Sequence, residues 1–163
     1  METLSKIGLG GGCHWCTEGV FVHLRGVERV EQGWISSSDP AAAAFSEAVI
    51  VYYDPVVVSL QQLIEVHLQT HAATVKHGLR HRYRSAVYYF DTAERADVVA
   101  TLTTVASQYR EEVITQALPF GEFKPSLLEH QDYYRSDPER PFCVRYIQPK
   151  LDSLDPELLR ASG

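Results

Sequence analysis

Residues 45–70, FSEAVIVYYDPVVVSLQQLIEVHLQT, contain the patterns of a strand, a short turn and a capped helix in succession. Residues 45–53 are rich in β-branched and aromatic side chains and end before an Asp-Pro pair, which predicts a strand. Ser59 and Gln62 have the spacing of a capping box, and apolar residues follow at helical intervals. The second half of the stretch is therefore predicted to be a helix that occupies residues 59–70.

The remainder of the chain alternates in a similar way. We expect further strands at 4–10, 27–36, 83–90 and 113–118, helices at 13–24 and 91–112, and mostly loop with short elements over 119–163. The irregular spacing disfavours a doubly wound parallel sheet. It predicts an α+β fold, a two-layer sandwich with a mixed sheet and a ferredoxin-like (split βαβ) core. A single domain is expected to span 1–163, with 150–163 as a C-terminal tail.

Composition excludes several classes of partner. The chain has 163 residues, 45% of them hydrophobic and 22% charged, which is typical of a globular domain with one core. The net charge is −6 and the basic residues are scattered, so nucleic acid is not an expected partner. We find no signal peptide and no apolar run long enough for a membrane span, which predicts a cytoplasmic protein without a membrane partner.

Two of the three cysteines lie in the stretch GGGCHWC at residues 10–16. A helix that begins just after Gly12 places Cys13 at its N-terminus, where backbone N–H groups and the helix dipole stabilise a thiolate. Cys16 then lies one turn later on the same face, as in redox-active CxxC pairs. Helical neighbours have β-carbons ~5–6 Å apart, wider than the ~3.5–4.5 Å of a disulfide, so a bridge requires adjustment of the first turn. The alternative is that both thiols are small, inert core residues.

A zinc site is a second alternative. His77 and His81 form an H-x3-H pair that would complete a Cys2His2 set with Cys13 and Cys16. The two pairs are roughly sixty residues apart, far beyond zinc-finger spacing, and the histidines have basic neighbours. We therefore expect no metal and no other cofactor.

The chain resembles the A-type peptide methionine sulfoxide reductases in an ordered series of motifs over about residues 7–151. These motifs are GGCHWCTEGVFVHLRGV, which is similar to the active-site stretch of the family, and then SEAVIVYYDPVVVSLQQLIEV, YRSAVYYF, HQDYY and PFCVRYIQPKL. The resemblance implies that Cys13 is the nucleophile and that Trp15 is a wall of the pocket for the substrate methyl group. It also implies that Glu47 is the acid near the sulfoxide oxygen, and that the hydroxyls of Tyr83 and Tyr133 hydrogen-bond this oxygen.

The residues themselves also favour an acid at Glu47. In the strand predicted at 45–53, this side chain shares a face with four apolar residues, Phe45, Val49, Val51 and Tyr53. A carboxyl group among apolar side chains has its pKa raised by desolvation, so it can hold and deliver a proton at neutral pH. The alternative is a glutamate at the end of the strand that reaches solvent.

Several residues depart from the family pattern, and they bear on substrate identity. His14 stands where the family has Phe, which makes the methyl pocket more polar on one side. Cys16 stands where the family has Gly. Leu128 replaces an Asp, with Glu129 next to it, and the family's His-Asp-Pro is His71-Ala72-Ala73. We expect His14, Trp15 and Glu129 to contact the substrate.

The predicted function is reduction of methionine S-sulfoxide, free or in proteins, through a sulfenic acid on Cys13. A second thiol then forms an intramolecular disulfide, which a thioredoxin-type partner reduces. Proximity favours Cys16 as this second thiol over Cys143, which matches a cysteine in the family's tail. Two other functions are left open at this point: a general CxxC thiol-disulfide oxidoreductase, and a zinc-binding module without catalysis.

Overall fold

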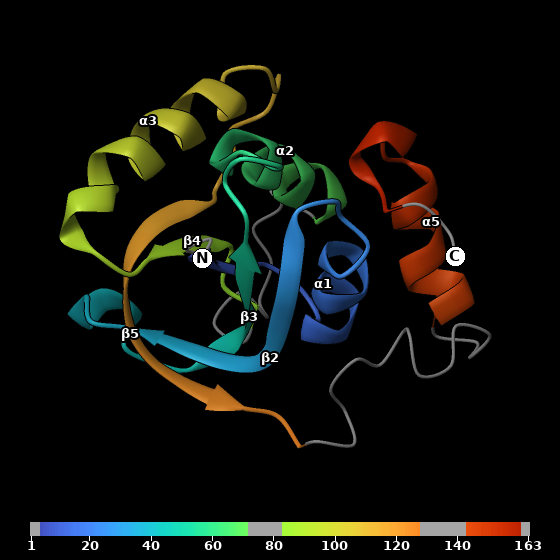
Figure 1. The fold of residues 1–163 in the computed structure, drawn as a ribbon. Coiled ribbons are helices and arrows are strands. Elements are labelled where there is room, and N and C mark those ends of the chain that lie inside the picture. Colours follow the sequence, from blue (N-terminus) through green and yellow to red (C-terminus); the bar gives the residue numbers. More distant parts are fainter. Residues whose placement is uncertain (1–3, 72–82, 128–142, 161–163) are drawn as a thin grey trace.

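The computed structural model describes residues 4–71, 83–127 and 143–160. Within these ranges, strands form one closed sheet in the order β1-β3-β2-β5-β4 (Figure 1). All neighbouring pairs are antiparallel except β4 and β5, which are parallel. The strands are β1 Ser5–Gly10, β2 Val27–Ser37, β3 Ser46–Tyr53, β4 Ala86–Tyr89 and β5 Gln116–Pro125.

Helices cover the outer face of this sheet, and α1 lies between β2 and the C-terminal helices (Figure 1). The α-helices are α1 His14–Phe21, α2 Leu60–Thr70, α3 Arg95–Ala106 and α5 Gln148–Asp152, and the π-helical segment η4 Cys143–Ile147 leads into α5. Short 3-10 turns are η1 Pro40–Ala42, η2 Thr92–Glu94 and η5 Pro156–Leu158. None of the helices in the described ranges has both the length and the apolar character that a membrane span requires.

The strand and the capped helix predicted from residues 45–70 are confirmed as β3 and α2. The Ser59 hydroxyl accepts a hydrogen bond from the Gln62 amide at 3.1 Å, and the Gln62 side chain accepts one from the Ser59 amide at 3.0 Å. This reciprocal pair satisfies two backbone donors at the helix start, which fixes where α2 begins.

The α+β class and the mixed sheet are confirmed, and the strands of this sheet close on themselves, which the predicted two-layer sandwich does not specify. The cause lies in β5, which changes partner along its length. Residues 116–119 pair in parallel with β4, and residues 120–125 pair antiparallel with β2. β4 in turn pairs with β1, so the ring of strands has no free edge. Because β5 pairs first with β4 and then with β2, it extends to Pro125, beyond the predicted end at 118.

Alternation along β3 divides the core into two parts. Val49 and Val51 face the helices, where they pack with residues of α1, α2, α3 and α5. Ala48 and Ile50 face the opposite side, the interior of the closed sheet, with Tyr88. Glu47 falls on the helix-facing side and is only 4% exposed, so the predicted apolar face is confirmed around it. Phe45, which we expected on the same face, precedes the strand and is exposed.

Closure depends on the close approach of β2 to β5 at Gly33. A β-carbon at this position would collide with the carbonyl oxygen of Lys124, and the Phe123 ring and the Pro125 α-carbon would also lie too close. Backbone atoms cannot rotate away, so Gly33→Ala should lower the free energy of unfolding by about 1–3 kcal/mol in urea titrations. Gly12→Ala is the matched control, because a β-carbon there meets no atom within 4 Å. Equal stability of the two variants would contradict this account of closure.

Candidate active site

Cys13 is the residue that caps the N-terminus of α1, as the sequence predicts. Its carbonyl oxygen accepts hydrogen bonds from the Cys16 and Thr17 amides at 3.1 and 3.2 Å, which begin the helix. The glycines before it carry the chain from the end of β1 into this turn. Gly11 packs against the His71 ring so closely that a β-carbon would collide with it. The backbone that carries Cys13 is therefore held on its C-terminal side by the first hydrogen bonds of α1 and on its N-terminal side by the packing of Gly11 on His71.

The environment of Cys13 favours a thiolate. A hydrogen bond from the Cys16 side chain is the largest influence and, with the backbone amides of Trp15 and Cys16, it outweighs burial and the charge of Glu47. Together these effects lower the pKa of Cys13 to about 7. Both residues are half-buried, and no disulfide joins them in the structure. The CxxC pair thus has the low pKa and partial exposure of a reactive cysteine.

Glu47 lies beside this helix start on β3. Its Oε1 atom accepts a hydrogen bond from the backbone N–H of His14 at 3.3 Å, and the His14 Nδ1 atom is 3.7 Å from the same oxygen. Both side chains are buried, with 4% and 6% exposed. The hydrogen bond to His14, the residue after Cys13, places the carboxyl group beside the start of α1, and its charge raises the pKa of Cys13.

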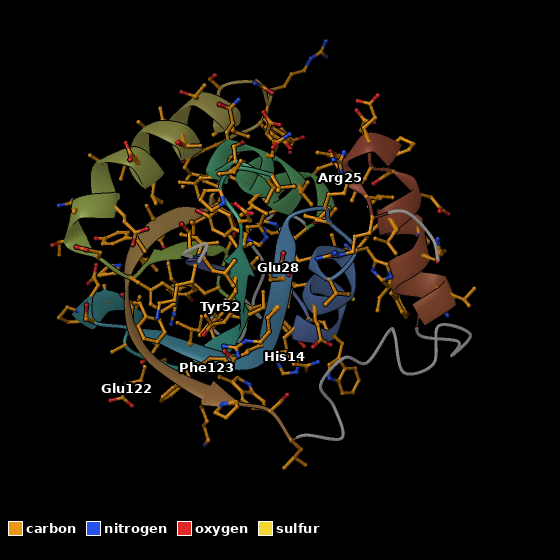
Figure 2. The ribbon with its side chains drawn as sticks, viewed as in Figure 1. His14, Arg25, Glu28, Tyr52, Glu122 and Phe123 are labelled. Atoms are coloured by element: carbon orange, nitrogen blue, oxygen red, sulfur yellow. The ribbon has the colours of Figure 1, made fainter. Side chains whose placement is uncertain are left out.

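An aromatic cluster of His14, Trp15 and Trp34 lies beside the Glu47 carboxyl group. The His14 Nδ1–H donates to the Gly33 carbonyl oxygen at 2.9 Å, which orients the ring, and Figure 2 shows this side chain at the start of α1 near β2. Trp34 packs edge-on to the His14 ring at 5.1 Å between centroids, and Trp15 is tilted against it at 6.2 Å. Sequence reasoning missed Trp34, because only the register of β2 against β3, which pairs Trp34 with Glu47, places it here.

A pocket of about 380 Å³ opens beside Cys13, between α1, α2 and α5. The lining residues are Gly11, Gly12, Cys13, Cys16, Thr17, Val20, His67, Thr70, His71, Tyr83 and Lys150. Its size suits a small ligand. Three of the predicted site residues, the two cysteines and Tyr83, therefore meet in one cavity, whereas Glu47 approaches Cys13 from the side of the aromatic cluster.

Two histidines, His67 within α2 and His71 at its C-terminal end, line the pocket. His67 donates from Nε2 to the Gly10 carbonyl oxygen at 2.8 Å, and burial, with smaller contributions from His71 and Lys150, lowers the pKa of His67 well below its ordinary value. His71 stacks on His67 at 4.1 Å, donates from Nδ1 to the His67 carbonyl oxygen, and contacts the Ser85 hydroxyl through Nε2 at 2.8 Å. These contacts tie α2 to the turn that carries Cys13.

The model of the peptide methionine sulfoxide reductase family matches residues 5–161 of the chain. The chain belongs to this family. Peptide methionine sulfoxide reductase MsrA from a Psychrobacter species is 29% identical to it over 94% of this chain and 96% of that protein. Membership confirms the resemblance that the motifs indicate and the class of enzyme that it implies.

Solved structures share the fold of this chain. Mxr1 from Saccharomyces cerevisiae in its reduced form superposes with a TM-score of 0.72 at 20% identity, over 86% of this chain and 89% of that one. Mxr1 in complex with Trx2 gives a TM-score of 0.61 at 21% identity, over 80% and 84% of the two chains. At this level of identity the likeness concerns the fold alone.

Several predicted residues lie outside the part of the chain that the structure describes. They are Leu128, Glu129, Tyr133, the histidines His77 and His81, and the side chain of Cys143. Within the described ranges, no three His, Cys, Asp or Glu side chains come together in a way that could hold a metal ion. The predicted roles of Glu129 and Tyr133 stay predictions.

The low pKa of Cys13 depends first on the Cys16 thiol, which gives a direct test. Alkylation by iodoacetamide requires the thiolate, so its rate at Cys13 should rise with pH around a midpoint of about 7. Cys16→Ala removes the hydrogen bond and should move this midpoint upward, toward 9.0, whereas the hydroxyl of Cys16→Ser should preserve part of the effect. Peptide mass spectrometry reads the site of alkylation. The same midpoint in the alanine variant would show that Cys16 does not stabilise the thiolate.

Proposed function

We propose that the chain reduces methionine S-sulfoxide to methionine with Cys13 as the nucleophile. One observation carries this proposal: Cys13 caps α1 in a pocket, has its thiol pKa lowered to about 7, and lies beside the buried carboxyl group of Glu47. A nucleophile and an acid that approach one point from two sides are what sulfoxide reduction needs. Family membership supplies the substrate class.

The chemical step transfers one oxygen atom. The Cys13 thiolate attacks the sulfoxide sulfur while Glu47 delivers a proton to the oxygen. The protonated oxygen then passes from the substrate sulfur to the Cys13 sulfur, so the substrate S–O bond and the transient S–S bond break while a Cys13 S–OH bond forms. Methionine leaves with its sulfur reduced by two electrons, and Cys13 is oxidised to a sulfenic acid. The hydroxyls of Tyr83 and Tyr133 hydrogen-bond the oxygen as it gains charge, and Tyr83 lines the pocket with Cys13.

The aromatic cluster provides the wall for the substrate methyl group. His14 replaces a phenylalanine of the family, but its Nδ1–H is committed to the Gly33 carbonyl oxygen. The ring therefore offers its face, together with Trp15 and Trp34, as an apolar surface. Glu129, which the sequence predicts as a substrate contact, is a further member of this binding site in our proposal.

Cys16 resolves the sulfenic acid in this proposal. The Cys16 thiol attacks the Cys13 sulfur, water leaves, and a Cys13–Cys16 disulfide forms. The hydrogen bond from the Cys16 side chain to Cys13 supports it, since the two residues lie within one helical turn. The backbone that follows Cys143 is anchored by Ile147 and Leu151, which are buried against the core.

A thioredoxin-type dithiol returns the enzyme to its starting state. It reduces the disulfide by thiol exchange and is itself oxidised. The fold likeness to Mxr1, which has been solved in complex with Trx2, supports this class of partner. We place the reaction in the cytoplasm, where such dithiols keep cysteines reduced.

Replacement of the acid tests the chemical step. Glu47→Gln preserves a hydrogen-bonding side chain but removes the transferable proton, so single-turnover release of methionine from the S epimer should slow by roughly 10²–10⁴-fold. Quenched-flow sampling across pH measures this rate. Glu122→Gln is the control, because Glu122 is an exposed acid on β5 that points to solvent (Figure 2), and Cys13→Ser gives the zero-activity reference. A Glu47→Gln rate equal to that of the control would reduce this carboxyl group to a structural role.

Peptide mapping after one turnover without reductant tests the second step. We expect a Cys13–Cys16 bridge, because these thiols are already in contact. In Cys16→Gly the first methionine should still be released, while recycling by a thioredoxin-type dithiol should slow sharply. A Cys13–Cys143 bridge, or a sulfenic acid that persists beside a reduced Cys16, would contradict the assignment.

A further inference from the structure

Of the pocket-lining residues that the structure describes, Lys150 is the one charged side chain, and the reaction above does not use it. It comes from α5 at the C-terminal end of the described chain, nearly 140 residues after Cys13. Its Nζ atom donates a hydrogen bond to the carbonyl oxygen of Thr70, the last residue of α2. An ammonium group has three N–H donors, and this is the only bond that the described residues give it.

The helix that carries Lys150 is anchored to the rest of the protein. Leu151 and Leu154 are buried in the core on either side of the turn that follows it. The Gln69 side chain donates to the carbonyl oxygen of Ser153 at 2.9 Å, which ties α2 to the end of α5. Lys150 is therefore held at the pocket wall and requires little ordering when a ligand binds.

The surroundings of Lys150 favour an anionic ligand. Among the described residues that line the pocket, none carries a carboxylate, and Glu47 lies on the other side of Cys13. Both ring nitrogens of His71 are already occupied by protein oxygens. The Lys150 ammonium is thus the group through which this end of the pocket can recognise a ligand charge.

The three substituents of the sulfoxide sulfur determine which part of the substrate lies near Lys150. Besides oxygen, the sulfur carries a methyl group and the methylene that leads to the α-carbon. If Glu47 takes the oxygen and the aromatic cluster takes the methyl group, the methylene chain is left to run into the pocket beside Cys13, which Lys150 also lines. Its far end carries the α-carboxylate when the substrate is the free amino acid or the C-terminal residue of a peptide.

We propose that Lys150 binds the α-carboxylate of free or C-terminal methionine sulfoxide and so makes these the preferred substrates. This assignment rests on the proposed function and narrows its substrate class. An internal residue has a neutral amide at the same place and would leave the ammonium without its partner. Preference for a carboxylate is then a property of one side chain that is remote in sequence from the nucleophile.

Steady-state kinetics with matched substrates test the assignment. The substrates are free methionine S-sulfoxide and its carboxamide, and a dipeptide with C-terminal methionine S-sulfoxide and its carboxamide. Wild type should have a kcat/KM about 10-fold or more higher for each acid than for its amide, chiefly through KM. Lys150→Met should abolish most of this ratio, Lys150→Arg should retain it, and Lys124→Met, which removes an exposed lysine on β5, should not change it.

The outcomes separate the alternatives. If Lys150→Met loses the acid-to-amide preference only for free methionine sulfoxide, the site recognises the free amino acid. If the preference is lost for both acids, the site recognises any terminal α-carboxylate. Equal losses on acids and amides in Lys150→Met would show that Lys150 only ties α5 to α2, and would overturn the assignment. If this variant does not fold, the wild-type ratio decides, and a value near one overturns it. Wild type that reduces amides but shows no preference leaves the proposed function intact, whereas wild type that reduces none of the four substrates refutes both.

Discussion

The hydrogen bond from the His14 amide to Glu47 is the contact on which the site depends. It joins the first backbone donor of α1 to an acid on the neighbouring strand, so helix start and acid are placed by one interaction. A helix N-terminus has unpaired donors and attracts negative charge. Here the helix start lies beside two acidic groups, the Glu47 carboxyl and the Cys13 thiol, within a single turn.

Several effects act on the pKa of Cys13 in opposite directions, and their relative sizes decide whether the thiolate is favoured. The charge of Glu47 and burial both raise the pKa of Cys13, yet the net pKa is about 7 against an ordinary 9.0. Two pKa units correspond to about 3 kcal/mol in favour of the thiolate. The Cys16 hydrogen bond is the largest contribution. Cys16 therefore has two consecutive roles in our account, since it stabilises the nucleophile before the reaction and captures the sulfenic acid after it.

Sequence patterns predicted the features that arise within short segments. The capping box at Ser59, the β3 strand and the location of Cys13 at the start of α1 depend on neighbours in the chain, and all three are present. Features set by pairing at a distance were not accessible. Closure of the sheet requires β5 to change partner, and no local signal marks that change. Trp34 and Lys150 reach the site through strand register and docking of α5, so the composition of the pocket could not be predicted from spacing.

The central claim is that Cys13 takes the oxygen of methionine S-sulfoxide and that Cys16 then forms a disulfide with it. Reduced protein mixed with excess S epimer, without reductant, tests it most directly when released methionine and remaining thiols are quantified on the same sample. We predict one methionine per chain and the loss of two thiols, with no methionine from the R epimer. Loss of thiols without methionine, or equal release from both epimers, would contradict the account.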